Sequence, residues 1–422
     1  MSTLLVGAAQ VVTCQGPPRA RRGPEMGELG VREDVAVLIG DDGHIAAVAP
    51  YAELMTQAGE AAVQEVDGVL FPGFVDCHTH AVFGMARLDD HERRSRGAGY
   101  KEIAAAGGGI LSSVRDVRQR SYDELVELTR HRLDRLLALG STTVEVKSGY
   151  GLALEAELKQ LEVIAAMAAD GGPQVVPTFL GAHEVPQEYR PRADEYVELV
   201  IHEMLPAVER QGVARYCDVF CEPGVFTVDQ SRRVLQAARR HGLRAKLHAD
   251  ELDPSGGAEL AAELRAASAD HLAAISEEGI AALAASETVA VLLPGTMMFL
   301  GQRRQAPGRR LIDAGAAVAL ATDFNPGSSP GMSLPLMATL AASQCGMAPA
   351  ETITAITVNG AAAVGEAHTR GQIAPGFRAD LVLAAVRDWR ELVYWYGDNL
   401  VTEVWLGGRA CHPRRWAVNF IV

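Results

Sequence analysis

Two histidines in the segment DCHTH (76–80) have the spacing of a pair of metal ligands. They follow a short apolar stretch, residues 74–76, that predicts a β-strand. Side chains two residues apart on a strand point to the same face, so the imidazoles of His78 and His80 can reach one ion together. A His-x-His pair is also common among hydrogen-bonded core or surface residues, so the chemistry depends on further ligands.

Four later residues fall at the carboxyl ends of other predicted strands: His183, His248, His271 and Asp323. In a β/α barrel these strand ends converge on one mouth. Imidazoles and a carboxylate suit zinc or iron, and three or four protein ligands with an open position make a catalytic site. The alternatives are a turn role for Asp323, a loop role for His183 and a buried, hydrogen-bonded His271.

The elements that must position these residues alternate between short apolar runs and long helical stretches after residue 73. This rhythm is typical of βα units around a parallel sheet. The eight predicted strands are 74–76, 143–146, 175–179, 217–220, 245–247, 267–269, 289–293 and 318–321. Eight strands close a TIM barrel, so we predict an α/β protein with a (β/α)8 barrel.

Both ends of the chain have β character. Short strands at 4–6, 35–39 and 45–48 predict an antiparallel sheet, and strands return at 379–383 and 401–406. We predict a small composite β-sandwich domain built from residues 1–70 and 370–422. The barrel of residues 71–369 is then the catalytic domain.

The composition of the chain argues against several classes of binding partner. A formal net charge of -14 disfavours nucleic acid and anionic membrane surfaces. No secretory signal or apolar run long enough to span a membrane is evident, and six cysteines are too few for a disulfide framework. We expect a cytoplasmic enzyme that acts on a small molecule, and a homodimer, since symmetric dimers are the commonest soluble oligomers.

Several longer motifs resemble a known family. The segment PGFVDCHTH (72–80) with the late Thr322-Asp323 resembles the amidohydrolase superfamily. The resemblance narrows to the imidazolonepropionase family of histidine degradation and runs nearly from end to end. It is carried by the motifs VKSGYGL (146–152), FLGAH (179–183), HADE (248–251), SADHL (268–272) and ATDFNPGSS (321–329).

The resemblance implies a metal-dependent hydrolase that opens 4-imidazolone-5-propanoate to N-formimidoyl-L-glutamate. It implies one divalent ion per subunit, zinc or iron, on His78, His80, His248 and Asp323. The residues it implies for substrate binding are Arg87, Tyr100, Tyr150, His183, Glu251, Asn325, Gly327 and Ser328. A guanidinium such as Arg87 can hold the carboxylate tail of the substrate bidentately.

The implied mechanism uses a metal-activated water. His271 and Asp323 would orient and deprotonate it, and Glu251 would pass a proton to the ring nitrogen. Glu222 stands where binuclear relatives carry a bridging lysine, which favours a single ion. Residues 89–97 are more basic than the family pattern. Two alternatives remain open: a deaminase on the same metal frame, and a catalytically silent scaffold.

Overall fold

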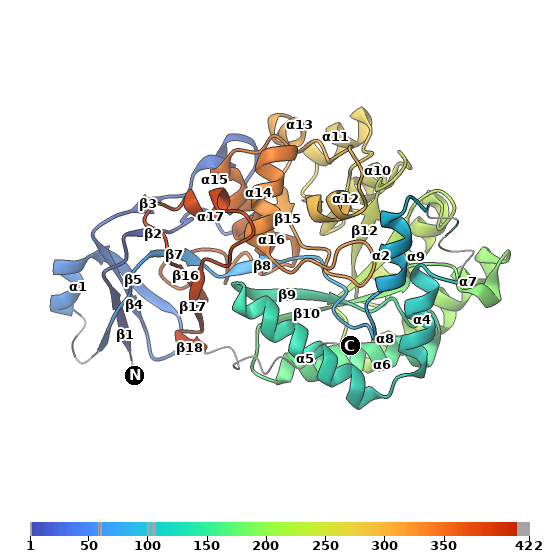
Figure 1. The fold of residues 1–422 in the computed structure, drawn as a ribbon, viewed down its shortest axis with the longest axis horizontal. Helices are drawn as coiled ribbons and strands as arrows, with labels where there is room; N and C mark the ends of the chain where they lie inside the picture. The colour runs from blue at the N-terminus through green and yellow to red at the C-terminus, as the bar shows by residue number, and fades with distance from the viewer. Residues whose placement is uncertain (1, 58, 60, 99–101, 103–106, 412–422) are drawn as a thin grey trace.

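A computed structural model describes residues 2–57, 59, 61–98, 102 and 107–411 of the chain. Its centre is a sheet of eight parallel strands that follow one another in chain order (Figure 1). These strands are β8 (Phe74–Asp76), β9 (Ser141–Lys147), β10 (Gln174–Ala182), β11 (Tyr216–Cys221), β12 (Arg244–Ala249), β13 (Ser268–His271), β14 (Val289–Leu292) and β15 (Val318–Leu320). Each contains or overlaps one of the eight predicted strands, and the predicted (β/α)8 barrel is confirmed.

Helices lie between the strands and cover the outside of the barrel (Figure 1). Those of the barrel region are α2 (Leu88–Ser95), α4 (Ile110–Gln119), α5 (Tyr122–Ala138), α6 (Leu154–Ala169), α7 (Ala193–Leu199), α8 (Leu205–Gln211), α9 (Val228–Arg240), α10 (Gly257–Glu263), α11 (Glu277–Ala284), α12 (Pro294–Phe299), α13 (Gly308–Asp313), α14 (Leu334–Gln344), α15 (Pro349–Ile356) and α16 (Val358–Ala363). Three short segments have other helical geometry: the 3-10 helices η1 (Gly23–Gly27) and η2 (Gln187–Tyr189), and the π-helix η3 (Val200–Met204).

The first and last barrel strands meet at a seam that lies just beyond their carboxyl ends. Thr79 and Phe324 form a parallel bridge there. The amide of Asp323 donates to the carbonyl of His78 at 3.0 Å, and the amide of His80 donates to the carbonyl of Phe324 at 2.9 Å. The two segments that carry predicted ligands are therefore joined to each other by backbone hydrogen bonds.

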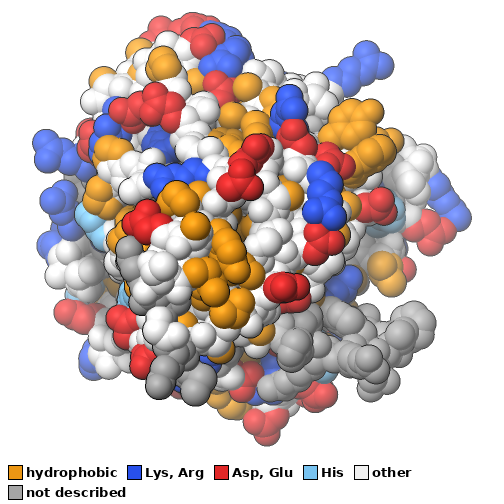
Figure 2. Space-filling view, turned by 90° about the vertical axis from the view of Figure 1, so that its left-hand side faces the viewer, with side chains coloured by type: hydrophobic (Ala, Val, Ile, Leu, Met, Phe, Trp, Pro, Cys, Tyr) orange, Lys and Arg blue, Asp and Glu red, His pale blue; other side chains and the backbone are white. Residues whose placement is uncertain are grey.

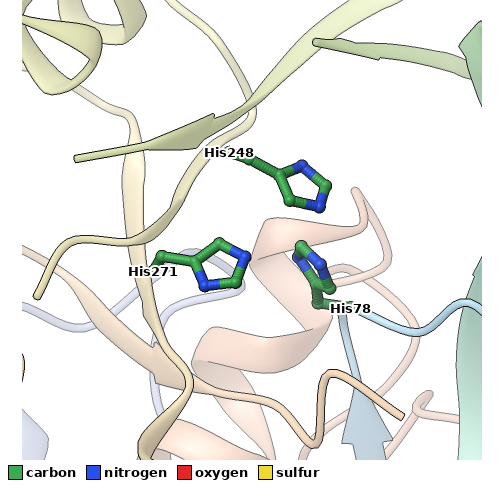
Figure 3. Close-up of side chains that lie close together, drawn as sticks. All are labelled: His78, His248 and His271. Atoms are coloured by element: carbon green, nitrogen blue, oxygen red, sulfur yellow. The ribbon is translucent and has the colours of Figure 1, made fainter. Parts of the chain in front are cut away.

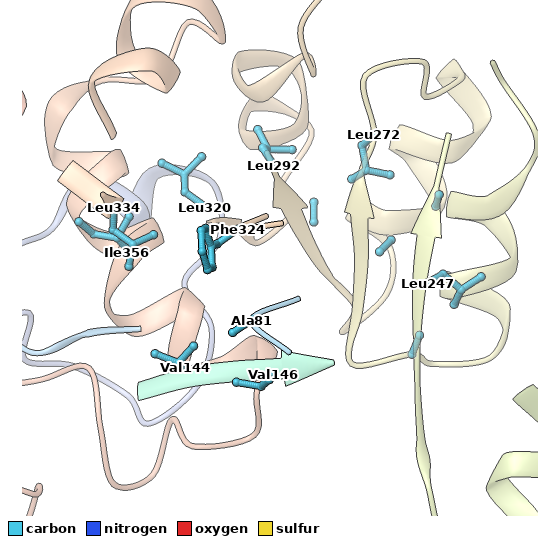
Figure 4. Close-up of a cluster of buried hydrophobic side chains, with 14 of the residues drawn as sticks. Ala81, Val144, Val146, Leu247, Leu272, Leu292, Leu320, Phe324, Leu334 and Ile356 are labelled. Atoms are coloured by element: carbon cyan, nitrogen blue, oxygen red, sulfur yellow. The ribbon is translucent and has the colours of Figure 1, made fainter. Parts of the chain in front are cut away.

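Alternation along the strands separates two environments. In β9, Val144 and Val146 point outward and join the apolar layer between strands and helices, with Leu334 of α14 and Ile356 of α15 (Figure 4). Glu145 and Lys147, which alternate with these valines along the strand, are also fully buried. Since successive side chains of a strand point to opposite faces, these charged groups lie inside the barrel.

The terminal segments form two further sheets. One has the order β5-β4-β1-β6, from β1 (Thr3–Val6), β4 (Val35–Ile39), β5 (Ile45–Pro50) and β6 (Ala62–Glu65). The other has the order β18-β17-β16-β7-β2-β3, from β2 (Gln10–Val12), β3 (Val31–Arg32), β7 (Val69–Pro72), β16 (Leu381–Ala384), β17 (Val401–Leu406) and β18 (Arg409–Cys411). Helix α1 (Tyr51–Gln57) precedes β6, and α17 (Glu391–Tyr394) precedes β17.

These sheets pack on each other through one apolar cluster. Leu5 and Val37 of the first sheet share it with Leu70, Leu381 and Trp405 of the second. The predicted pairing of N- and C-terminal strands is thus confirmed. The strands predicted at 4–6, 35–39 and 45–48 pair antiparallel as expected. Two further pairings that the sequence analysis did not anticipate, β1 with β6 and β2 with β7, are parallel. Helix α1 provides the crossover that lets β6 return parallel to β1.

The surface at the sheet-bearing end mixes acidic and basic side chains, with hydrophobic groups exposed between them (Figure 2). Helix α1, which lies at this end in Figure 1, exposes Tyr51 and Met55. Among the described residues, no helix has the length and apolar character needed to span a membrane.

Candidate active site

The two histidines that follow β8 face the carboxylate that follows β15. His78 Nε2 lies 3.3 Å from His80 Nε2. Oδ1 of Asp323 lies 3.4 Å from the first of these nitrogens and 3.5 Å from the second. All three side chains are buried. The seam of the barrel therefore brings together three of the four predicted ligands.

The fourth, His248, comes from β12 on the other side of the barrel mouth. Its Nε2 lies 3.4 Å from His80 Nε2, and its ring centroid lies 4.5 Å from that of His78. His271, the last residue of β13, completes the group with its ring centroid 5.1 Å from that of His248. In Figure 3 the rings of His78, His248 and His271 point toward one another from three strands.

The spacing of these atoms fits a divalent cation. A tetrahedral ion with ligands at about 2.0–2.1 Å holds them roughly 3.3–3.4 Å apart, close to the separations observed among His78, His80 and Asp323. Burial lowers the pKa of His78 and His80, so both rings are neutral, the form that coordinates metals. Three compact triads of possible ligand atoms occur among the described residues: His78–His80–Asp323, His78–His248–His271 and His80–His183–His248.

Neighbouring side chains orient the ligands. Asp270 Oδ2 lies 2.6 Å from His78 Nδ1, and Asp218 Oδ2 lies 3.0 Å from His248 Nδ1. The hydroxyl of Thr296 donates to Asp323 Oδ2 at 2.7 Å, which leaves Oδ1 toward the histidines. A carboxylate on the far nitrogen of a ligating histidine fixes its tautomer and raises its basicity. Hydrogen bonds thus hold two predicted ligands, His78 and Asp323, with one atom toward the cluster, while the predicted ligand His248 lies within ion-pair distance of Asp218.

His183 lies beside the cluster on the loop after β10. Its ring stacks on that of His80, with centroids 4.9 Å apart and planes 15° from parallel. Its Nδ1 lies 3.0 Å from the carbonyl of Gly149. Gly149 has φ of +112°, and a Cβ there would come within 2.9 Å of that nitrogen, so the position requires glycine. This explains the glycine of the KSGYG segment.

Glu251 and His271 form an acid-base pair at the edge of the cluster. Glu251 Oε2 lies 3.7 Å from His271 Nδ1, while His271 Nε2 has no hydrogen-bond partner. Burial, the charge of Asp323 and the charge of Glu222 raise the pKa of Glu251 to about 8. Burial lowers the pKa of His271 to about 3. Near neutral pH the carboxyl therefore carries a proton and the imidazole does not.

Asp323 keeps its charge in the same surroundings. Although burial alone would raise its pKa, hydrogen bonds from His78 and His80 hold it well below the usual range. Its backbone has φ of +51°, and His271 has φ of +81°. Left-handed backbone at non-glycine residues is uncommon and costs energy, and it often marks functional sites. Both residues are strand-end residues whose side chains the backbone turns toward the cluster.

Glu222, directly after β11, points away from the cluster. Its carboxylate accepts hydrogen bonds from the amides of Glu251, Leu252 and Asp253 at 2.7–3.2 Å. It supports the loop that carries Glu251. The residue at this position is Glu222, and a site with one ion remains a prediction.

Arg87 lies on the far side of the seam, against the loop after Asp323. Its guanidinium packs on Gly327 so closely that a Cβ on that glycine would lie 1.7 Å from Nη2. The Nε atom of Arg87 is buried and has no hydrogen-bond partner among the described residues. Tyr150 is almost fully buried beside the stacked rings of His80 and His183, with its ring centroid 5.9 and 5.4 Å from theirs. A partly exposed cation and a phenol therefore adjoin the cluster.

The side chain of Asn325 shapes the loop between the ligand and Arg87. Its Oδ1 accepts hydrogen bonds from the amides of Gly327 and Ser328, both at 2.8 Å. Its Nδ2 donates to the carbonyl of Asp323 at 2.7 Å and to the Ser328 hydroxyl at 2.9 Å. In this structure the side chain of Asn325 is fully engaged in folding the loop.

The unusually basic stretch 89–97 is mostly helix α2. Arg94 donates to the carbonyl of Gly327 at 3.2 Å and lies over the ring of Phe299. His91 stacks on the same ring, with centroids 4.8 Å apart. The added charge thus packs α2 against the Gly327 loop and α12.

Tyr100 falls outside the described residues. Of the remaining predicted site residues, the structure brings all into or beside one cluster. Sequence reasoning missed Asp218, Asp270 and Thr296, which orient the ligands. A signal was available for Asp218, because an acidic residue inside a predicted buried strand, here 217–220, requires a partner. Asp270 directly follows the predicted strand 267–269 and gave no such signal.

The comparisons with known proteins agree with this geometry. The sequence model of the Amidohydrolase family matches residues 69–411. The chain is 47% identical over 412 residues to the imidazolonepropionase of Solibacter usitatus, covering 97% of this chain and 98% of the relative. It is 48% identical over 408 residues to that of Geobacillus kaustophilus, covering 95% and 96%.

Two solved structures share the fold at low identity. An adenosine deaminase from Xanthomonas campestris with bound zinc superposes with a TM-score of 0.71 at 20% identity, covering 97% of this chain and 92% of that one. The guanine deaminase of E. coli gives 0.72 at 14% identity, covering 98% and 99%. These likenesses concern the fold. The sequence relatives at nearly half identity decide the family: the chain belongs to the amidohydrolase family and, within it, to the imidazolonepropionases.

Proposed function

We propose that the chain hydrolyses the cyclic amide bond of 4-imidazolone-5-propanoate to give N-formimidoyl-L-glutamate. The observation that carries this proposal is the guanidinium of Arg87 against Gly327, on the loop that follows Asp323. This cation adjoins the histidine cluster, and it suits a propionate tail, since arginine binds carboxylates bidentately. It gives an acidic chain a local positive charge where an anionic substrate needs one.

One divalent ion, zinc or iron, would be held by His78, His80, His248 and Asp323. The spacing and burial of these side chains support this donor set. Imidazole and carboxylate ligands suit both metals, so availability decides between them. When bound, such an ion supplies the Lewis acidity that activates water near neutral pH.

The protein's own acid-base groups divide the proton transfers. His271 is neutral near pH 7 and can accept a proton from the attacking water, with Asp323 orienting that water. Glu251 is protonated near pH 7 and can donate to the ring nitrogen as the carbon-nitrogen bond breaks. Two groups whose surroundings drive their pKa values apart can serve as base and acid.

The substrate would lie between the cluster and the Arg87 loop. Arg87 and Tyr150 would bind the carboxylate tail. His183, Glu251, Asn325, Gly327 and Ser328 would line the ring, and Tyr100 would add a further contact. The buried position of Tyr150 beside His80 and His183 supports this arrangement.

We also propose a cytoplasmic homodimer with no nucleic-acid or membrane partner. The net charge of -14 supports the exclusion of polyanions. Light scattering on the eluted protein, which returns the mass in solution, tests the dimer. A mass near one chain, 44.9 kDa, would refute it.

The activity is tested by following the absorbance of freshly generated 4-imidazolone-5-propanoate. The protein is assayed as purified, after chelation, and after zinc or iron is added back. We expect loss on chelation and recovery with metal. A metal-loaded protein that leaves this substrate intact but deaminates purines would refute the proposal.

Two substitutions separate metal binding from proton transfer. His271→Ala should keep its metal and lose most turnover, whereas His248→Ala should lose both. His202→Ala, on an exposed side chain, is the matched control and should behave as the parent. Metal content is measured by elemental analysis. Full turnover in His271→Ala would remove that residue from the mechanism.

A further inference from the structure

A lysine lies fully buried inside the barrel, beneath the histidine cluster. Lys147 is the last residue of β9, and its side chain has no exposed surface. Its Nζ lies 2.9 Å from Glu145, 2.8 Å from Asp218 Oδ2 and 3.8 Å from Asp270 Oδ2. One ammonium group therefore faces carboxylates from three barrel strands.

Two of these carboxylates also hold the proposed ligands. Asp270 Oδ2, which faces Lys147, is the same atom that lies 2.6 Å from His78 Nδ1. Asp218 Oδ2, which faces Lys147, is the same atom that lies 3.0 Å from His248 Nδ1. Each oxygen is thus shared between an imidazole and the ammonium. The orientations of His78 and His248 are linked through a single side chain that touches neither ring.

Without a cation these carboxylates would be free to turn. Asp270 Oδ1 has no hydrogen-bond partner among the described residues, so the direct contacts that orient its carboxylate are those of Oδ2 with His78 and Lys147. Asp218 is anchored further, because its Oδ1 accepts from the amide of His248 at 3.1 Å. Removing the ammonium would therefore disturb His78 most and His248 less.

We propose that Lys147 is a positioning residue for the metal centre: by binding Asp218 and Asp270 it holds His78 and His248 with Nε2 toward the ion. This inference rests on the metal site proposed above. Partners that orient metal ligands typically contribute about 10- to 100-fold to metal affinity. A purely electrostatic role would act in the opposite direction, because removing a positive charge near a cation should tighten its binding.

The neighbouring Lys246 offers a matched control. It is equally buried and carries the same charge. Its Nζ lies 3.0 Å from Glu145 Oε1 and donates to the carbonyl of Cys77 at 2.9 Å. Its charge also acts on Asp270, but no hydrogen bond or ion pair among the described residues joins it to Asp218 or Asp270. Replacing it removes the same charge from the same interior without releasing the carboxylates behind the histidines.

The experiment compares zinc affinity, by chelator competition, in the parent, Lys147→Met and Lys246→Met. We expect Lys147→Met to bind zinc about 10- to 100-fold more weakly than the parent, and Lys246→Met to differ much less. In the cobalt-loaded proteins, the visible spectrum should change shape only in the Lys147 variant, since it reports ligand geometry. Equal affinities in the two variants, or tighter binding by Lys147→Met, would overturn the inference.

A charge-balanced variant keeps the inference testable if Lys147→Met does not fold. Lys147→Met combined with Glu145→Gln removes one cation and one anion from the cluster. Among the described residues, Glu145 makes no hydrogen bond or ion pair with His78, His80 or His248. The double variant should be more stable than Lys147→Met but should keep the weakened zinc binding. Recovery of parental affinity would overturn the inference. A parent that binds no zinc, iron or cobalt would instead refute the metal site itself, an outcome that the parent alone reveals.

Discussion

The position of the Arg87 guanidinium depends on the absence of a side chain at Gly327. The guanidinium occupies the space that any Cβ on Gly327 would need. Gly327 has no left-handed backbone that would itself require glycine. Glycine is therefore needed here because Arg87 approaches closely. A substitution at this position tests the placement of the Arg87 side chain.

We predict that Gly327→Ala raises KM and changes kcat less. The new methyl group displaces Arg87, and a hydrogen bond to a charged group is worth about 1.5–3 kcal/mol, so KM should rise about 10- to 100-fold. Gly331→Ala is the control, because a Cβ there meets only Met337 Cε at 3.8 Å. Steady-state kinetics of both variants give the answer. An unchanged KM in Gly327→Ala would separate Arg87 from the substrate.

Glu251 makes the stability of the metal-free protein depend on pH. Its pKa is about 8 in the folded chain and 4.5 in an exposed side chain, because of burial and of the charges of Asp323 and Glu222. Between these values the folded chain holds a proton that the unfolded chain has released. Stability contributed by this group is present below pH 4.5 and is lost as pH rises through about 8.

Glu251→Gln should therefore lose less stability than the parent as pH rises. Urea denaturation of the metal-free proteins at about pH 6 and about pH 9 measures the difference. The variant is expected to be the more stable of the two at the higher pH. Glu278→Gln, at an exposed carboxylate, should follow the parent. Parallel losses in Glu251→Gln and the parent would show that Glu251 is charged in the folded state.

At the scale of elements, the barrel depends on how its first and last strands join. Thr322 lies directly beyond β15, and its hydroxyl donates to Asp76 Oδ2 of β8 at 2.6 Å. Its amide donates to Asp76 Oδ1 at 3.0 Å. Burial raises the pKa of Asp76 to about 7, which these hydrogen bonds oppose. The seam thus depends on the buried carboxyl group of Asp76 and on the hydrogen bonds that Thr322 donates to it.

Thr322→Val should destabilise the protein by about 1–3 kcal/mol, the cost of leaving a buried acceptor without its donor. The control is Thr129→Val, since the Thr129 hydroxyl is equally buried and has no partner to lose. Chemical denaturation measures both free energies of unfolding. Equal effects would mean that the hydroxyl of Thr322 does not support the seam.

The sequence was sufficient to predict the strands and most of the cluster. The carboxyl ends of all strands in a barrel lie at one mouth, so His78, His248 and Asp323 could be placed together before any distance was known. The groups behind them could not be placed in this way. Asp218, Asp270 and Lys147 act through partners on other strands, and strand pairing alone determines which carboxylate meets which histidine. Arg87 was found by resemblance only, since its role depends on a contact with Gly327 some 240 residues later.

At the scale of the whole molecule, we propose that residues 1–70 with 370–422 form one domain and residues 71–369 another. The described part of the smaller unit has its own apolar cluster, in which Trp405 is fully buried. Histidine ligands and acid-base groups all belong to the larger unit. Damage to the smaller core should therefore spare the barrel.

Trp405→Ala tests this division. Truncating a buried tryptophan costs about 3–5 kcal/mol. Hydrogen exchange should show lost protection in β1, β4, β7, β16 and β17, with the barrel strands unchanged. Trp395→Ala, at a half-exposed residue, should leave exchange close to that of the parent. Uniform loss across the barrel strands would instead indicate one cooperative unit.

The six-stranded terminal sheet also constrains how a nascent chain can fold. Strand β7 ends at Pro72, but its neighbour β16 begins only at Leu381. At roughly 5–20 residues per second, about 300 intervening residues take the ribosome some 15–60 seconds. During that time the β16-facing edge of β7 lacks its native partner, and an open apolar edge can recruit foreign strands. We therefore expect production in cells to depend on keeping this edge away from foreign strands, by a chaperone or by a low concentration of nascent chains, until the last strands leave the ribosome.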